Sequence, residues 1–342
     1  RFVFNALEEP IDMIKHGELY AINYGKHRII FYEDINKFIN QLGDIFPNEK
    51  DGFKKFYRDM EKMYLNVIAS HPTYVSPDVV KVQEGAKQFL NHPLSYIKFL
   101  GYLNCSTKSV LEKYFKDKEV FNFFDKLTST YCYTNVEETP AVLSSIMFID
   151  NHYGGSYYPA GSTLNLVGKL EKIIEENMGE MIYNKEVVRI LVEDNKAVGV
   201  QLDDKSIINA DYIVYSGTVW NLYNKLLEEY TDKKIIDEIN KIEATYPSLV
   251  LFTLVNENVI PKDTLPIEML VSNKNEIDEN ELTAYIFSLD DKSICPKGYH
   301  TVITIGPSLK KWPKGFKNNY NNKKLGFFKP SFYLIISKES IH

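Results

Sequence analysis

This 342-residue sequence has few cysteines and no long apolar runs. It has three cysteines, Cys105, Cys132 and Cys295, and no two are close together, so neither a disulfide framework nor a zinc site is indicated. Its apolar runs, such as Ser248 to Val255, have the length of buried strands. A membrane-spanning helix needs about 20 apolar residues, and no stretch of the sequence qualifies.

Charge of one sign and the common catalytic signatures are lacking as well. The formal net charge is −6, with 40 basic and 46 acidic residues, and the basic residues are scattered, so binding to nucleic acid is not expected. The seven histidines do not have the spacing of metal ligands, and no metal site is predicted. Gly154-Gly155-Ser156 lacks the final glycine of a nucleophile elbow, because Tyr158 stands in that place.

What is present is a compact unit between Tyr153 and Leu227. It opens with the glycine-bracketed loop YGGSYYPAGS, and Ser162 can cap a helix that ends near Gly179. Apolar residues recur in this helix at spacings of three and four, which predicts one stripe facing a core. They are Leu164, Val167, Leu170, Ile173 and Ile174.

The hydrophobic period then changes from 3.6 to 2. Alternating apolar residues over 188–192 and 198–202 predict two strands, and a third is predicted within NADYIVYSGTVW. Asp194 and Asn195 lie between the first two strands and tolerate the left-handed backbone of a tight turn. An ordinary α/β segment that packs its own core would show the same pattern.

Strands are also predicted at both ends of the chain. The apolar runs on either side of Gly25-Lys26-His27 predict a hairpin, and SLVLFTLVN, TAYIFSLD and HTVITIGP predict three further strands. We expect these strands and the hairpin to form one sheet.

Residues 35 to 150 are rich in aromatics at helical spacing. The longest stripe follows Pro47, a second helix opens at Pro93, and further helices are expected around 107–115 and 117–127. Two interpretations remain open: the aromatics form a core, or part of them lines a tunnel or a membrane-docking face for a long apolar substrate. The first stripe comprises Phe53, Phe56, Tyr57, Met60, Met63, Tyr64 and Val67.

The central unit resembles the middle of a phytoene desaturase-type flavoprotein, the family of carotenoid desaturases, carotenoid isomerases and retinol saturases. The residues that carry the resemblance are Tyr158, Pro159 and Gly161; Val187 and Ile190; Gly199 and Val200; and Ala210 and Asp211. Two positions depart from the family pattern. Ser162 stands where a second glycine is usual, and Ser216 to Val219 replace an Asn-Ala-Asp-Pro turn.

The resemblance implies an α/β (mixed α+β) two-domain flavoprotein of the FAD/NAD(P)-binding Rossmann-like type, with a helical lid and a mixed-sheet substrate domain. It implies FAD as the cofactor, with the backbone of Val187 at the adenine end and the backbone of Ser216 and Gly217 near the dinucleotide. It assigns no catalytic residue. Asp150 and His152, which flank the glycine loop, are the first polar candidates for a site.

The domain division implied is a substrate-domain hairpin (1–35), a helical lid (36–150), part of the FAD-binding domain (151–228), a substrate-domain sheet (229–310) and a degenerate or truncated tail (311–342). No Gly-x-Gly-x-x-Gly turn is present, the chain starts at Arg1, and the resemblance fades from about Leu325. We therefore expect an incomplete, inactive central fragment of the enzyme.

The expected activity of the parent enzyme is desaturation, isomerisation or saturation of a long apolar, isoprenoid-like substrate, in a cytoplasmic protein with peripheral membrane contact. Because a flavin supplies the redox chemistry itself, the missing acid–base constellation does not argue against this activity. Two alternatives stay open: a flavin amine oxidase-like enzyme, and a non-catalytic remnant that binds no flavin.

Overall fold

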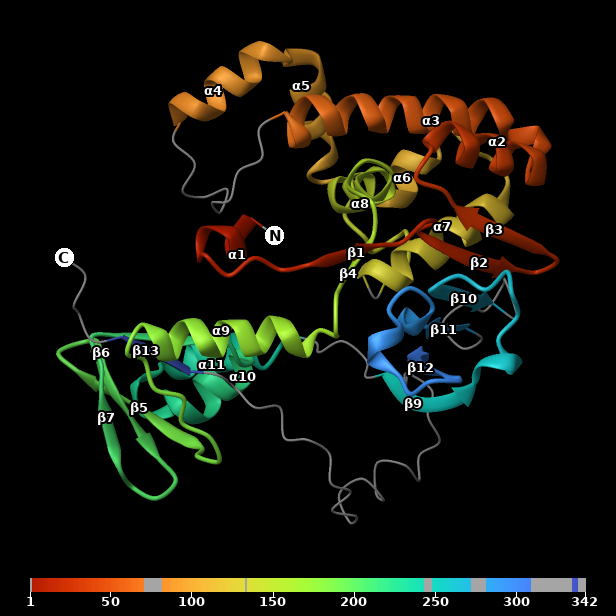
Figure 1. The fold of residues 1–342 in the computed structure, drawn as a ribbon. Helices are drawn as coiled ribbons and strands as arrows, with labels where there is room; N and C mark the ends of the chain where they lie inside the picture. Colours follow the sequence, from red (N-terminus) through yellow and green to blue (C-terminus); the bar gives the residue numbers. More distant parts are fainter. Residues whose placement is uncertain are drawn as a thin grey trace, which may run out of the picture. The chain divides into compact units, whose positions relative to one another are not determined.

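The computed structural model describes residues 2–70, 82–132, 134–242, 248–271, 281–308 and 334–337 (Figure 1). The chain divides into two compact units. The first comprises residues 1–170 and 246–311, and the second comprises residues 171–245 and 312–342. Each unit is described by itself.

A six-stranded mixed sheet organises the first unit, in the order β3-β2-β10-β11-β12-β9. The predicted N-terminal hairpin is confirmed, since β2 and β3 pair from Tyr20↔Phe31 to Tyr24↔His27 and Gly25 turns with φ +59°. The three later strands lie in the same sheet, as expected. The strands are β2 (Tyr20–Tyr24), β3 (His27–Phe31), β9 (Ser248–Asn256), β10 (Ile267–Val271), β11 (Glu281–Tyr285) and β12 (Tyr299–Ser308).

β10 is the strand that the sequence interpretation missed. It pairs in parallel with β2 on one side and antiparallel with β11 on the other, so it joins the hairpin to the rest of the sheet. Its five residues, IEMLV, are too short and too weakly alternating to stand out beside the longer runs.

One face of this sheet is predominantly apolar, and directly paired residues point to the same side of a sheet. We call it the apolar face. Following the register from Ile22 through Met269 to Thr283, and from Tyr285 through Ile303 to Phe252, keeps to this face. The opposite face carries the Arg28–Glu268 ion pair and is partly solvated.

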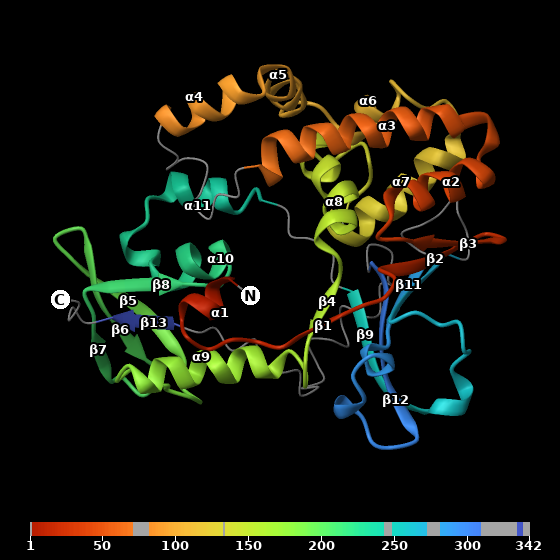
Figure 2. The same ribbon diagram turned by 45° about the horizontal axis from the view of Figure 1, so that its top comes forward.

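Helices cover the apolar face over β3 and β2 (Figure 2), and Met269 and Val271 of β10 belong to the same buried core. The predicted aromatic stripe is confirmed as core, since all seven of its residues are buried, from Phe53 in α3 to Val67 in the π-helical turn η2. Asp34 caps α2 through its side chain. The helices are α2 (Ile35–Ile45), α3 (Lys50–Met63), η2 (Tyr64–Ala69), α4 (Val82–Asn91), α5 (Pro93–Tyr102), α6 (Thr107–Leu111), α7 (Lys118–Cys132) and α8 (Ala141–Gly154).

Shorter elements complete the first unit. β1 and β4 pair as a two-stranded ribbon, and two 3₁₀ turns, η8 and η9, follow β11. Their bounds are α1 (Phe2–Ala6), β1 (Met13–Lys15), η1 (Pro47–Glu49), β4 (Tyr157–Pro159), η6 (Glu257–Val259), η8 (Phe287–Leu289) and η9 (Lys292–Ile294).

In the second unit, the antiparallel strands β5, β6 and β7 form a three-stranded sheet beside the pair β8–β13. The predicted turn is confirmed, with Asp194 and Asn195 at φ 48° and 61°. A small core holds the unit together around Ile190, Val200 and Leu226. The elements are β5 (Val187–Glu193), β6 (Lys196–Leu202), β7 (Ile207–Asn209), β8 (Tyr212–Tyr215), α10 (Val219–Asn221), η4 (Leu222–Leu226), η5 (Glu228–Tyr230), α11 (Lys233–Ile239) and β13 (Leu334–Ser337).

Helix α9 (Leu164–Glu176) runs from the first unit into the second and corrects one prediction. It forms where the spacing predicted it, but none of its residues is buried, and Leu164 is 77% exposed. The prediction that its apolar stripe faces a core is therefore wrong for the described part of the chain. Periodicity shows that a helix is amphipathic, but it does not show what covers the apolar side.

No helix within the described ranges is both long and apolar enough to cross a bilayer.

Candidate functional site

The glycine-bracketed loop is held against the start of the chain. β4 pairs with β1, Ala160 N–H donates to Asp12 O (2.9 Å), and His16 N–H donates to Ser156 O (3.0 Å). Gly155 and Gly161 have φ of +74° and +76°, a backbone region that favours glycine. The loop is thus a fixed structure rather than a loose connection.

A pair of aspartates at the end of η8 fixes the other side of this loop. Asp291 accepts a 2.7 Å hydrogen bond from the Gly161 N–H, and hydrogen bonds from Ser293 and Gly161 lower the pKa of this carboxyl group. Asp290 lies 2.5 Å from Nδ1 of the buried His16, which stacks on Phe287. These contacts align the loop with the end of β11.

Three aromatic side chains form a wall where the loop meets the sheet. The rings of Tyr158 and Phe287 stack with centroids 4.2 Å apart, and Tyr285 lies 5.6 Å from Phe287. A pocket of about 170 Å³ opens beside them. It is lined by Tyr158, Ser162, Phe252, Thr253, Tyr285, Phe287, Ile294, Thr301, Val302 and Ile303.

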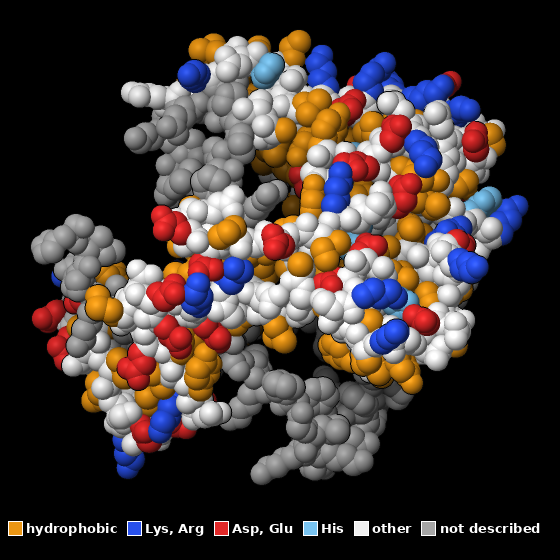
Figure 3. Space-filling model, in the orientation of Figure 1, with side chains coloured by type: hydrophobic (Ala, Val, Ile, Leu, Met, Phe, Trp, Pro, Cys, Tyr) orange, Lys and Arg blue, Asp and Glu red, His pale blue; other side chains and the backbone are white. Residues whose placement is uncertain are grey.

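The chemistry of this pocket is apolar. Its lining has no carboxylate, amine or imidazole, and burial raises the pKa of the Tyr158 phenol, which stays protonated at neutral pH. The pocket continues along the uncovered end of the apolar face, where Val250, Phe252 and Leu254 of the edge strand β9 are 44%, 72% and 51% exposed. Figure 3 shows apolar side chains gathered over this edge. Such a surface can hold an apolar molecule but supplies no acid–base group of its own.

The two polar candidates from the sequence, Asp150 and His152, have anchoring contacts in the helical layer. Asp150 accepts from Tyr64 OH at 2.5 Å, and His152 Nδ1 lies 2.7 Å from Tyr32 O among the rings of Phe31 and Phe38. Neither residue lines the pocket. Burial lowers the pKa of His152 to about 4, so it is neutral at physiological pH.

Sequence reasoning missed His16, Phe287, Asp290 and Asp291. Their partners lie far along the chain, and no local spacing links them. Asp290-Asp291 after a predicted strand was the only available signal, and it indicated no more than a turn.

Val187, Ser216 and Gly217, the predicted FAD contacts, all lie in the second unit. Val187 begins β5, an edge strand of its three-stranded sheet, so no described strand pairs with one side of its backbone. This fits the proposed adenine contact. Ser216 is exposed, and Gly217 leaves room for the Tyr215 phenol, whose oxygen would lie 2.1 Å from a Cβ at that position.

The close approach that Gly217 permits is therefore used by Tyr215, whose hydroxyl donates to Thr218 O at 3.2 Å and accepts from Asn221 Nδ2 at 2.9 Å. The Tyr215 ring thus occupies the side of Gly217 on which a Cβ would lie. The three contacts stay predictions.

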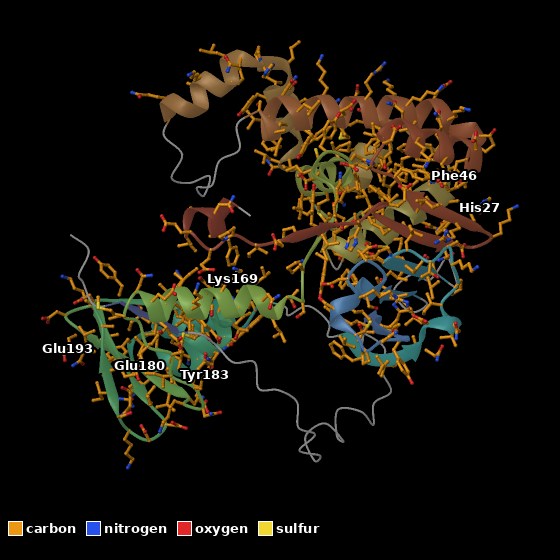
Figure 4. All side chains as sticks on the ribbon, in the orientation of Figure 1. His27, Phe46, Lys169, Glu180, Tyr183 and Glu193 are labelled. Atoms are coloured by element: carbon orange, nitrogen blue, oxygen red, sulfur yellow. The ribbon has the colours of Figure 1, made fainter. Side chains whose placement is uncertain are left out.

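A second, wider groove of about 520 Å³ lies between the β2–β3 hairpin and α2. His27 stands at the hairpin end, as Figure 4 shows. Two of the cationic side chains that line this groove have partners. Arg28 pairs with Glu268, and Lys37 lies 3.5 Å from the Tyr32 ring centroid. No group of three or more potential metal ligands occurs in the part of the chain that the structure describes.

Comparison with known proteins agrees with this geometry. Residues 83–314 match the family of flavin containing amine oxidoreductases. The match covers more than half of the chain, and the chain belongs to this family. FAD is accordingly the cofactor, as the resemblance implied.

Among curated proteins, the chain is 29% identical over 308 residues to a chloroplastic prolycopene isomerase of Daucus carota, covering 86% of this chain and 48% of that protein. It is 22% identical over 313 residues to a 4,4'-diapophytoene desaturase of Methylomonas sp, covering 88% and 59%. The chain thus spans about half the length of the curated relatives it matches. The resemblance to the desaturase and isomerase group is confirmed.

Solved structures support the fold. An oxidoreductase from Methanosarcina mazei matches with a TM-score of 0.58 at 18% identity, covering 94% of this chain and 67% of that one. A Pyrococcus furiosus protein matches with a TM-score of 0.59 at 14% identity and the same coverage. The expected mixed α/β fold is confirmed.

Proposed function

We propose that this chain provides the substrate-binding part of an FAD-dependent oxidoreductase that isomerises, desaturates or saturates a long, apolar, isoprenoid-like polyene. The observation that carries the proposal is the apolar face, which helices cover at one end and which is open beside the Tyr158–Phe287 wall at the other. A conjugated apolar chain needs a dry, aromatic surface, and the redox chemistry comes from the flavin.

The roles of the chain's own residues follow from this geometry. Tyr285 and Phe287 would lie against the polyene, and His16 would keep the Phe287 ring in place. Asp291 would hold the glycine loop so that Tyr158 stays in the wall. These residues bind and orient the substrate and exclude water; none needs to move a proton.

Polyene binding by the purified chain tests the proposal. A carotenoid-type polyene in detergent should quench the intrinsic fluorescence in a saturable manner. Phe252→Ser should weaken binding about tenfold or more, because burying a phenyl ring contributes roughly 1.5–3 kcal/mol. Leu251→Ser is the matched control, since Leu251 is 56% exposed on the opposite face of the same strand. Equal effects of the two substitutions, or no saturable binding, would contradict the proposal.

The amine oxidase-like alternative is less well supported. A primary or secondary amine is cationic at neutral pH, and a site for it benefits from a carboxylate or another strong acceptor. The lining of the aromatic pocket offers only hydroxyl groups and backbone oxygens. The third alternative, a remnant without flavin, is tested separately by cofactor content.

We further propose that α4 and α5 provide the peripheral membrane contact, because a polyene of this kind partitions into lipid. Five apolar residues with exposed fractions from 51% to 79% lie along this segment: one near the end of α4, three at intervals of three residues in α5, and one directly after α5. They are Leu90, Leu94, Ile97, Leu100 and Leu103. The expected cytoplasmic, membrane-associated location remains part of this proposal.

Sedimentation with phosphatidylcholine vesicles tests the membrane contact. Leu94→Asp and Ile97→Asp should each reduce the bound fraction severalfold, because a charge in the interface opposes burial of the stripe. Val259→Asp, at a 65% exposed position in η6, should leave it unchanged. Vesicle binding that is insensitive to the first two changes would exclude this face.

A further inference from the structure

Three buried polar atoms in the helical core have no hydrogen-bond partner among the described residues: Tyr20 Oη, Tyr57 Oη and His152 Nε2. Their residues are 3%, 0% and 6% exposed, so bulk water does not satisfy them. Buried polar groups in folded proteins are almost always paired, with protein atoms or with an ordered water. Three such atoms in one core therefore need an explanation.

The contact of His152 Nδ1 determines which tautomer the imidazole adopts, and therefore whether Nε2 donates or accepts. Nδ1 lies 2.7 Å from the carbonyl oxygen of Tyr32, which can only accept, so Nδ1 carries the proton. Because the imidazole is neutral at physiological pH, Nε2 is a bare acceptor that needs a donor.

The phenols lie around this ring. Tyr57 packs edge-on against His152, with centroids 6.1 Å apart, and Tyr20 stacks on Phe31, which in turn stacks on His152 at 4.6 Å. The rings of Tyr20 and Tyr131 meet edge-on with centroids 6.3 Å apart, so the Tyr131 phenol packs into the same part of the core.

We propose that this point in the core binds one internal water molecule, which accepts hydrogen bonds from Tyr20 and Tyr57 and donates to His152 Nε2. Its second hydrogen points to the oxygen of Tyr131, which already accepts from Asn151 Nδ2 at 3.0 Å and has a further lone pair. Two accepted and two donated bonds give the water its full complement. Buried waters of this kind commonly link otherwise unpaired groups.

The water would connect three segments of the first unit, one of which leads directly into the glycine loop. Tyr20 comes from β2, Tyr57 from α3, and His152 from the end of α8, directly before Gly154 and Gly155. The site is a structural one and lies apart from the aromatic pocket, so its failure would not affect the proposed function.

A double-mutant cycle on Tyr20 and Tyr57 tests the proposed water site. Tyr20→Phe and Tyr57→Phe should each lower the melting temperature by roughly 2–4 °C, and the double variant should lose clearly less than the sum, because the first change already releases the water. Tyr24→Phe is the control: its hydroxyl bonds directly to Glu119 O at 3.1 Å, so its effect should add to either of the others.

A crystal structure of the wild-type chain provides the direct measurement. We expect one ordered water within hydrogen-bonding distance of His152 Nε2 and both phenol oxygens. A direct Tyr57–His152 hydrogen bond, a dry core, or strictly additive losses in the cycle would each overturn the proposal. The crystallographic result decides the question even if a variant fails to fold.

Discussion

The carboxylate of Asp291 accepts a 2.7 Å hydrogen bond from the backbone N–H of Gly161, 130 residues earlier in the chain. This contact joins the glycine loop to the turn after β11 and keeps Tyr158 beside Phe287. The aromatic wall of the pocket therefore depends on the Asp291–Gly161 hydrogen bond, whose two residues do not line the pocket.

Asp291→Ala should destabilise the first unit by about 1–2 kcal/mol, since it leaves the Gly161 N–H without its acceptor. Hydrogen bonds from Ser293 and Gly161 lower the pKa of Asp291 in the folded protein. Its stabilising effect is therefore complete above the unfolded pKa of about 3.9 and is lost as the pH falls through the lowered folded pKa.

Urea unfolding at pH 7 and at pH 3 measures this difference. The gap between wild type and Asp291→Ala should be smaller at pH 3, whereas Asp263→Ala, at an exposed carboxylate, should have little effect at either pH. A gap that is the same at both values would show that the carboxylate charge is not involved.

Ser162→Gly should stabilise the protein by about 1 kcal/mol. Ser162 has φ 101°, a conformation that costs a non-glycine residue free energy, and it stands where the family usually has glycine. Its hydroxyl accepts from Leu164 N–H at 3.0 Å, but replacing such a cap with glycine costs only a few tenths of a kcal/mol.

Ser162→Ala separates the two effects, because it removes the hydroxyl and keeps the strained backbone. Thermal unfolding should rank the variants with glycine first, wild type second and alanine last. If glycine is less stable than wild type, the strain at this position is negligible.

His152 should make stability depend on pH in the acidic range. Burial lowers its folded pKa to about 4, whereas an unfolded histidine titrates near 6.5. Below pH 6.5 the unfolded chain takes up the proton first, so stability falls by about 3 kcal/mol as the pH is lowered from 6.5 to 4.

His152→Gln should flatten this part of the profile, since the glutamine amide can still donate toward Tyr32 O but does not titrate. His27→Gln, at the hairpin end, should leave the slope as it is. An unchanged slope in His152→Gln would mean that other groups account for the acid sensitivity.

The purified chain should contain much less than one equivalent of FAD. A Gly-x-Gly-x-x-Gly turn, which would hold the pyrophosphate, does not occur in these 342 residues. Flavin released by heat denaturation and measured by absorbance tests this, with Val187→Pro as a variant that should lower any residual binding. A full equivalent of tightly bound FAD would contradict the prediction.

Several elements could be predicted because their signals are local. The β2–β3 hairpin needs Gly25 at a left-handed turn, and Asp194-Asn195 serves the same purpose between β5 and β6. The aromatic stripe of α3 follows from spacing alone. The family resemblance rests on a few short motifs around Pro159 and Val187.

Other features could not be predicted from pattern. β10 has no distinctive alternation, and its parallel pairing with β2 depends on the whole sheet. Periodicity could not predict that the apolar residues of α9 stay unburied, or that the Tyr215 ring packs beside Gly217. Both features depend on which residues lie nearby in the folded chain.

Local signals predict most of the helices, strands and turns and the flavoprotein family, because propensity, periodicity and glycine conformation act over a few residues. Long-range polar contacts emerge from the packing of the folded chain: Asp291 with the Gly161 N–H, Asp290 with His16, and His152 with the Tyr32 carbonyl oxygen. The physical reason is that hydrogen bonds and ring stacking act over a few ångströms in space, and chain distance does not encode them.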